Sequence, residues 1–228
     1  MAEDPGRFSD VRALIFDLDG TLIDSKLDLA LSVNAALAQM GREPLSHERI
    51  YGYVGQGAPH LIARALGPGA GEEDCRRGLE TFLAYYRLHK LDNTVPYPGV
   101  REALAALQGM PMAVLSNKPV RPSQQILEGL GLAVYFRMVY GGNSFDKKKP
   151  DPMGVEVILR DFGAAPEQVM IVGDSEIDVQ TARNAGTFVC GVTYGLGSAR
   201  LAEFPPDLLL DNLQELPARL FATPPRRR

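Results

Sequence analysis

Short apolar runs alternate with helical patterns along most of this chain, and this alternation constrains its fold more than any other feature. The runs occupy residues 11–16, 112–115, 136–140, 169–172 and 188–192. Runs of this length that are bounded by glycine or aspartate are typical of buried parallel strands. The pattern predicts an α/β fold whose core is a doubly wound, Rossmann-like parallel sheet.

Helical spacing fills the gaps between several of these runs. Val100, Leu104 and Leu107 fall on one helical face. Asp151 and Pro152 supply a helix cap followed by a proline at the first helical position. Strands and helices therefore alternate in this part of the chain.

One long segment breaks the alternation, because residues 26–95 contain no clear strand. Helical spacing is visible there, for example at Leu79, Phe82, Leu83 and Tyr86. A block of about 70 residues is too long for an ordinary crossover between parallel strands. We therefore expect a helical cap domain at 25–95, inserted between core segments 1–24 and 96–228, with hinges near Asp24-Ser25 and at residues 96–99. A separate helical domain with no role as a lid is the alternative.

Composition and charge exclude several classes of protein. The 228 residues are 45% hydrophobic and 23% charged, as in an ordinary soluble globular protein. A net charge of -4 gives no electrostatic footprint for nucleic acid, and no apolar run approaches membrane-spanning length.

Cys75 and Cys190 lie far apart, without zinc or disulfide spacing, and residues 1–5 have no signal pattern, so we expect a cytoplasmic protein. The arginines at 226–228 are expected to form a frayed tail.

Polar clusters follow the predicted strand ends. These clusters are Asp17-Leu18-Asp19, Ser116-Asn117-Lys118, Lys149, and Gly173-Asp174-Ser175 with Asp178. Open α/β sheets bind ligands at the carboxyl ends of their strands. Paired carboxylates at such an edge cost free energy unless a cation or a reacting group compensates for them. Taken alone, Asp17 and Asp19 are equally consistent with an acidic turn.

The four clusters together resemble the four motifs of the haloacid dehalogenase-like phosphohydrolases. Residues 16–22 resemble the first motif and residues 115–118 the second, while Lys149-Pro150 and residues 173–178 resemble the third and fourth. Their order and spacing are intact, and the resemblance runs from about residue 11 to residue 195. It implies a phosphoryl-transfer enzyme built on a parallel sheet.

The resemblance implies a role for each residue of the first three motifs. Asp17 is the implied nucleophile, which forms an aspartyl-phosphate. Asp19 protonates the leaving alkoxide and then activates the water that cleaves the intermediate. Ser116 and the backbone N–H of Asn117 donate to the phosphate. Lys149 offsets phosphate charge and keeps the nucleophile ionised.

The resemblance also implies a Mg²⁺ ion, which prefers a few carboxylates together with waters and phosphate oxygen. The implied ligands are Asp17, the backbone carbonyl of Asp19, and Asp174. Asp178 is expected either to hold a metal-bound water or to orient Lys149, and Ser175 lies beside it as a supporting residue. Helix capping is the structural alternative for Asp174 and Asp178.

Substrate specificity is expected to depend on the loop at residues 53–57, which is similar to the lid loop of the phosphoglycolate phosphatase subgroup. Gly55, Gln56 and Gly57 are the candidate specificity residues, because glycines allow close backbone approach and the next helix offers N–H groups to an anion. A tight turn between helices is the alternative. The directions of four further cations are left open by the sequence: Arg49, His60, Arg64 and Lys118.

The expected function is hydrolysis of a small phosphomonoester, with 2-phosphoglycolate as the leading substrate and an aspartyl-phosphate as intermediate. A related pyrophosphatase, or a sugar or nucleotide monophosphatase, is the alternative within the same superfamily. A catalytically silent protein that senses phosphate or binds a partner is a more remote alternative. Leu29 stands where mutase-type relatives carry a histidine, which argues against a mutase. We expect a small phosphate ester as the partner, not nucleic acid or membrane, and the sequence leaves the oligomeric state open.

Overall fold

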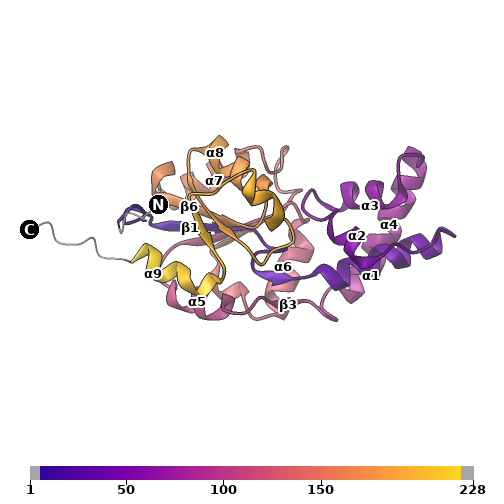
Figure 1. Cartoon of the computed structure of the whole chain (residues 1–228), viewed down its shortest axis with the longest axis horizontal. Helices are drawn as coiled ribbons and strands as arrows, with labels where there is room; N and C mark the ends of the chain where they lie inside the picture. The colour runs from indigo at the N-terminus through magenta and orange to yellow at the C-terminus, as the bar shows by residue number, and fades with distance from the viewer. Residues whose placement is uncertain (1–5, 222–228) are drawn as a thin grey trace, which may run out of the picture.

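The computed structural model describes residues 6–221 (Figure 1), and it is organised around a parallel sheet. The strand order is β5-β4-β1-β6-β7-β8, and each neighbouring pair is parallel. The strands are β1 (Ala13–Phe16), β4 (Met112–Leu115), β5 (Met138–Tyr140), β6 (Val169–Gly173), β7 (Phe188–Val192) and β8 (Leu208–Leu210). This arrangement confirms the predicted doubly wound α/β class.

The order of the strands determines where a ligand can bind. From β1 the chain moves outward to β4 and β5, then returns to the other side of β1 to form β6, β7 and β8. The direction of winding therefore reverses between β1 and β6. Ligands of open α/β folds bind at such a switch point, outside the carboxyl ends of the strands.

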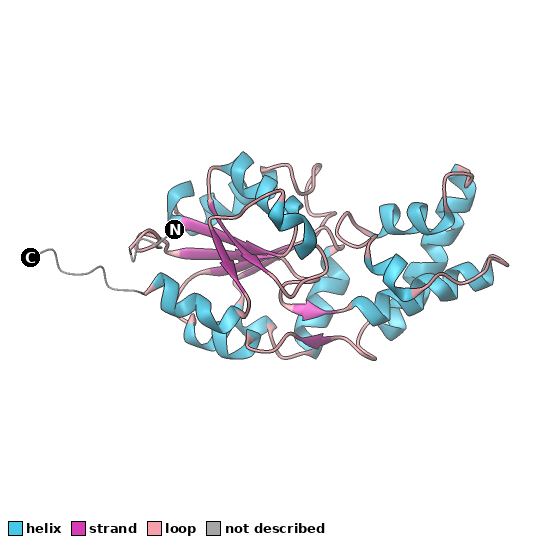
Figure 2. Ribbon diagram, in the orientation of Figure 1, coloured by secondary structure: helices cyan, strands magenta, loops and turns pink. Residues whose placement is uncertain are grey.

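Helices cover both faces of the sheet (Figure 2). They are α5 (Val100–Ala106), α6 (Val120–Gly129) and α9 (Leu216–Leu220) on one face, and α7 (Met153–Phe162) and α8 (Glu176–Ala185) on the other. The central strand shows the consequence: Leu14 and Phe16 pack into one apolar cluster, while Ala13 and Ile15 pack into the other. Side chains alternate between the faces of a strand, so a strand covered on both sides is apolar throughout.

Four helices separate β1 from β4 in the chain and form a helical block at the right of Figure 1. They are α1 (Lys26–Gln39), α2 (His47–Tyr51), α3 (Ala58–Leu66) and α4 (Glu72–His89). Phe82 and Tyr86 are buried, as the spacing in α4 predicts, whereas Leu83 is 39% exposed. A block of four helices has room for only a narrow apolar stripe on each helix.

Two chain crossings join the helical block to the sheet. There β2 (Ile23–Asp24) pairs antiparallel with β3 (Val95–Pro96), a pairing that two-residue strands give no periodicity to predict. Beside it the buried carboxylate of Asp28 accepts hydrogen bonds from the Thr94 backbone N (2.8 Å), the Thr94 hydroxyl (2.7 Å) and the Asn93 backbone N (3.0 Å). The first and last residues of the block are thereby held together.

The remaining regular elements are short 3₁₀ turns: η1 (Ala133–Tyr135), η2 (Pro166–Gln168), η3 (Ser198–Ala202) and η4 (Leu213–Glu215). Within residues 6–221, no helix has both the length and the hydrophobicity that crossing a bilayer requires. The expectations for the N-terminal residues 1–5 and for the arginine tail at 226–228 concern segments outside the described residues.

Candidate active site

The polar clusters meet at the carboxyl ends of three adjacent strands. Asp17 follows β1, Ser116 follows β4 and Asp174 follows β6, and β1 lies between the other two. Because each strand is parallel to its neighbour, all three residues lie at the same edge of the sheet. This edge includes the switch point between β1 and β6.

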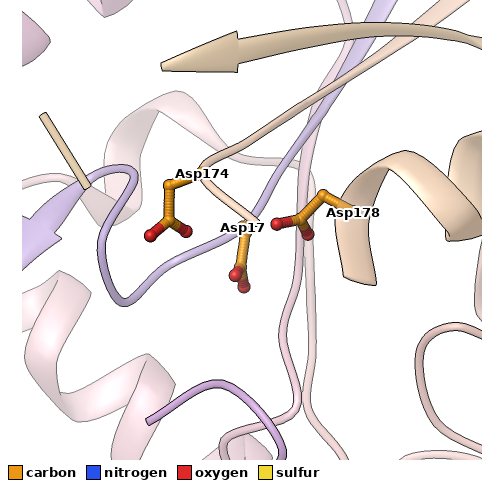
Figure 3. A group of neighbouring side chains, drawn as sticks. All are labelled: Asp17, Asp174 and Asp178. Atoms are coloured by element: carbon orange, nitrogen blue, oxygen red, sulfur yellow. The ribbon is translucent and has the colours of Figure 1, made fainter. Parts of the chain in front are cut away.

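Three buried or half-buried carboxylates converge there (Figure 3). One oxygen each from Asp17, Asp174 and Asp178 lie within 4.8 Å of one another. Burial raises the pKa of Asp17 to about 6, against the opposing effect of Lys149. Burial, reinforced by the charges of Asp178 and Asp17, raises the pKa of Asp174 to about 8. Such a group of anions requires a compensating positive charge.

Lys149 supplies part of that charge. Its ammonium is buried and lies 3.0 Å from Asp17 Oδ1 and 2.7 Å from Asp178 Oδ1. Burial alone would lower the pKa of Lys149, but the charges of Asp17 and Asp178 raise it overall, so the side chain stays cationic. The contact fixes the ammonium beside Asp17.

Asp178 has protein partners on both of its carboxylate oxygens. Oδ1 contacts Lys149, and Oδ2 accepts hydrogen bonds from the Ser175 backbone N (3.1 Å) and the Ser175 hydroxyl (2.7 Å). The same side chain therefore orients Lys149 and caps the first turn of α8.

The residues around Asp174 fit a magnesium ion. One Asp174 oxygen accepts from the Gly197 backbone N (2.8 Å) and the other from the Thr21 hydroxyl (3.3 Å). Gly20, with φ +87°, lies so close that a Cβ there would overlap the Asp174 carboxylate. The carboxylate oxygens of Asp17 and Asp174 are hard ligands of the kind that Mg²⁺ prefers. Of the ligands expected from the sequence, the structure brings Asp17 and Asp174 together, and the Asp19 carbonyl stays a prediction.

Asp19 is paired with a different lysine. Lys118 Nζ lies 2.8 Å from Asp19 Oδ2 and 3.0 Å from Oδ1, and the Ser25 hydroxyl donates a short hydrogen bond to Oδ1. Lys118 is buried, and Asp19 raises its pKa overall although burial acts in the opposite direction. The sequence left Lys118 open between the site and the surface, and the structure buries it in the site.

Asn117 links the 53–57 loop to the sheet. Its side-chain amide donates to the Gly55 carbonyl and to the Lys149 carbonyl, both at 3.1 Å. Gly57 has φ +90°, and a Cβ on it would lie 3.0 Å from the Asn117 carbonyl oxygen. Close backbone approach therefore requires glycine at position 57.

The three candidate specificity residues of this loop line two different hollows. Gly55 and Gly57 line the cavity that contains Asp17 and Asp19. Gln56 is exposed and lines a separate hollow, while its backbone carbonyl accepts a 2.6 Å hydrogen bond from Lys148 Nζ. The structure thus brings the two glycines to the cavity but not the Gln56 side chain.

The cavity lies between the sheet edge and the helical block. The sheet side contributes Asp17, Asp19, Ser116, Asn117 and Lys118, whereas the helical block contributes mainly apolar side chains, including Leu29, Leu61, Phe82, Leu83 and Tyr86. Leu29, noted for replacing the histidine of mutases, is among them. One wall is charged and the other is largely apolar.

The basic residues Arg49, His60 and Arg64 of the helical block do not line the cavity that contains Asp17. Arg49 Nε donates to the Tyr53 hydroxyl (2.7 Å), and the Arg64 guanidinium lies over the Tyr53 ring, 4.4 Å from its centroid. Both arginines line a second hollow together with His60. They are therefore not directed at Asp17.

Comparison with known proteins gives the family. Residues 14–192 match the family model described as haloacid dehalogenase-like hydrolase. The chain belongs to the haloacid dehalogenase-like hydrolases. It is therefore an enzyme, and the matched segment includes every residue of the four motifs.

Relatives within the haloacid dehalogenase-like hydrolases agree on a phosphatase. A phosphoglycolate phosphatase of Pseudomonas savastanoi pv. phaseolicola is 40% identical over 214 residues, which cover 90% of this chain and 78% of the relative. One from Vibrio parahaemolyticus is 38% identical over 218 residues, covering 91% and 95%. The crystal structure of a predicted phosphoglycolate phosphatase from Haemophilus somnus superposes with a TM-score of 0.86 at 33% identity, covering 91% of this chain and 96% of that one.

Within this haloacid dehalogenase-like site, sequence reasoning missed several contributors. Ser25 and Thr21 bond to Asp19 and Asp174, and Tyr86 lies against Lys118, whose ammonium is 4.8 Å from the ring centroid. Thr21 lies within the first motif, so its position was a usable signal. Tyr86 gave none, because its spacing in α4 is that of an ordinary core residue.

Proposed function

We propose that this phosphatase depends on magnesium and hydrolyses a small phosphomonoester, most favourably 2-phosphoglycolate, through an aspartyl-phosphate on Asp17. One observation carries the proposal: Asp17, Asp19 and Ser116 line one cavity, and the Lys149 ammonium lies 3.0 Å from Asp17 Oδ1. The relatives named phosphoglycolate phosphatase support the choice of substrate.

In the first step an Asp17 oxygen attacks phosphorus and the ester P–O bond breaks. Lys149 keeps Asp17 ionised and offsets the charge of the phosphoryl oxygens. The Ser116 hydroxyl and the Asn117 backbone N–H donate to those oxygens. Asp19 gives its proton to the leaving alkoxide, and such acid catalysis is worth roughly 10²–10⁴ in rate.

In the second step Asp19 takes a proton from a water molecule, whose oxygen attacks phosphorus. The bond between phosphorus and the Asp17 oxygen breaks, inorganic phosphate leaves, and the Asp17 carboxylate is restored. The same residue thus acts as acid and then as base. Both steps balance without any further reactant.

A magnesium ion held by Asp17, Asp174 and the Asp19 carbonyl would neutralise negative charge that develops on the phosphoryl group. The raised pKa values of Asp17 and Asp174 are consistent with carboxylates that need such a cation.

Residues 25–95 are proposed to act as a lid over this chemistry. The helical block covers the cavity with apolar side chains, which would exclude bulk water from the first step. The paired crossing of β2 and β3 is the proposed hinge, because the chain passes between block and sheet there.

The free thiols of Cys75 and Cys190 fit a reducing compartment, and we propose the cytoplasm.

Release of p-nitrophenol from p-nitrophenyl phosphate tests the proposal. Turnover is expected with magnesium and should vanish with EDTA, then return on adding excess magnesium. Ranking phosphoglycolate, pyrophosphate, glucose phosphates and nucleoside monophosphates by kcat/KM then tests the substrate. Absence of turnover with magnesium on every compound would overturn the proposed function.

A further inference from the structure

The cavity carries one cation whose role the proposed chemistry leaves unassigned. Of the described residues that line it, Lys118 alone has a cationic side chain. It is 7% exposed and sits where the charged sheet side meets the apolar helical block, with Asp19 on one side and the Tyr86 ring on the other. Burying a lysine at such a place is costly unless it serves a charged partner.

The other nearby cations are committed to contacts that hold them in place. Lys149 lies between Asp17 and Asp178, at 3.0 and 2.7 Å. Lys148 donates to the Gln56 carbonyl at 2.6 Å. Arg49 and Arg64 face Tyr53 on the second hollow. A substrate in the cavity therefore has Lys118 as its nearest candidate for pairing a negative charge outside the phosphoryl group.

We infer that Lys118 selects substrates by binding a second anionic group, a carboxylate on the alcohol part of the ester. The inference rests on the proposed function, because it takes Asp19 as the group that reaches the ester oxygen. Lys118 then stands on the leaving-group side of phosphorus, opposite the nucleophile.

Ordinary bond lengths make this contact feasible. Lys118 Nζ lies 2.8 and 3.0 Å from the two Asp19 oxygens. If Asp19 hydrogen-bonds to the ester oxygen, the ammonium is within two hydrogen-bond lengths, about 6 Å, of that atom. In phosphoglycolate the carboxylate oxygens lie about 3 Å from the ester oxygen. They can therefore approach Lys118 to hydrogen-bond distance.

The contacts around Asp19 permit an exchange of partners. Lys118 bonds to both Asp19 oxygens. A substrate carboxylate can therefore replace one of these two bonds while the Lys118 ammonium keeps the other. The Ser25 hydroxyl keeps donating to Asp19 Oδ1 in the meantime. A second donor lies nearby, because the Tyr86 hydroxyl is buried close to the Lys118 ammonium.

The apolar wall strengthens this selectivity. Leu29, Leu61 and Phe82 line the cavity and offer no hydrogen bonds to a sugar or a base. They also keep water from the ion pair, which strengthens the attraction between the two charges. A small ester with a carboxylate can pair with Lys118 and also pack against the apolar wall. An ester with a neutral alcohol part leaves the buried ammonium paired with Asp19.

The test compares two substrates of nearly equal size, phosphoglycolate and 2-hydroxyethyl phosphate, on the full-length protein with magnesium. The wild-type ratio of their kcat/KM values should favour phosphoglycolate by about 100-fold or more, as expected where a site built to bind a polar group meets an analogue without it. Lys118→Met should lower this ratio below about tenfold, whereas Lys118→Arg should retain most of the preference.

Lys147→Met is the matched control, because Lys147 is exposed and its ion pair is with Asp151, four residues further along the same loop. It should leave the ratio unchanged. The ratio does not depend on how much of a preparation is folded, since both substrates are assayed on the same protein. A variant of reduced stability therefore still gives a valid answer.

Two outcomes would overturn the inference. The first is a wild-type enzyme that hydrolyses both esters equally well. The second is a Lys118→Met variant that loses the same factor on both, which would make Lys118 a positioning residue for Asp19 and nothing more. Failure of the proposed function looks different, because the wild type would then hydrolyse neither ester, nor p-nitrophenyl phosphate.

Discussion

The two walls of the cavity differ in chemical character, because the sheet side is charged and the helical block is largely apolar. On the sheet side, each carboxylate has a lysine, a hydroxyl or a backbone N–H within hydrogen-bond distance, as in the pairs Asp17–Lys149 and Asp19–Lys118. On the side of the helical block, the lining is mostly aliphatic and aromatic. The sheet side carries the charged and reactive groups, whereas the helical block shapes the cavity and excludes water from it. Changes to the catalytic groups of the first wall should therefore affect all substrates, whereas changes at Lys118 and on the second wall should affect them selectively.

The largest effect is expected at Lys149. Lys149→Met removes the cation between Asp17 and Asp178 and should lower kcat about 10³-fold or more on every phosphate ester. Steady-state rates on p-nitrophenyl phosphate and phosphoglycolate measure it. A loss confined to one ester would show that Lys149 selects substrates instead of serving the chemistry common to them.

Asp28 should have a large effect on stability, because it holds the two chain crossings together. Asp28→Ala leaves the buried donors of Asn93 and Thr94 without their acceptor, at a cost of about 3 kcal/mol. Urea unfolding, followed by circular dichroism, measures the change in the free energy of unfolding. An unchanged midpoint would mean that the crossings are held mainly by β2 and β3.

Gly57 tests the contact between the two walls. Gly57→Ala forces a side chain into the left-handed region and toward the Asn117 carbonyl, so the 53–57 loop should close less well. We expect kcat/KM to fall about tenfold, with a change in stability near 1 kcal/mol. If the activity survives while stability falls, the loop is a structural turn without a role in closure.

The smallest effect is expected at Lys148, which provides a direct contrast with its neighbour. Lys148→Met removes only the bond to the Gln56 carbonyl, from an exposed side chain. The rate on either ester should change by less than about threefold, since exposed contacts contribute little. A loss as large as that of Lys149→Met would contradict the division between the walls.

Much of the sheet side could be predicted from sequence, because local signals determine it. Apolar runs mark the strands, and residues directly after parallel strands must share an edge, which brings Asp17 near Ser116 and Asp174. The packing of side chains between distant segments gave no such signal. Lys118 meets Asp19 across 99 residues, and Asp28 meets Thr94 across 66. Two-residue strands and the direction of the Gln56 side chain likewise depend on tertiary contacts.

The most direct test of the account is a crystal structure of the wild-type enzyme with magnesium and beryllium fluoride, which imitates a phosphoryl group on a carboxylate. The account predicts the fluoroberyllate bonded to an Asp17 oxygen, in contact with Ser116 and Lys149, with the metal ion between it and Asp174. Fluoroberyllate bound elsewhere, or bound without those contacts at full occupancy, would contradict covalent catalysis by Asp17.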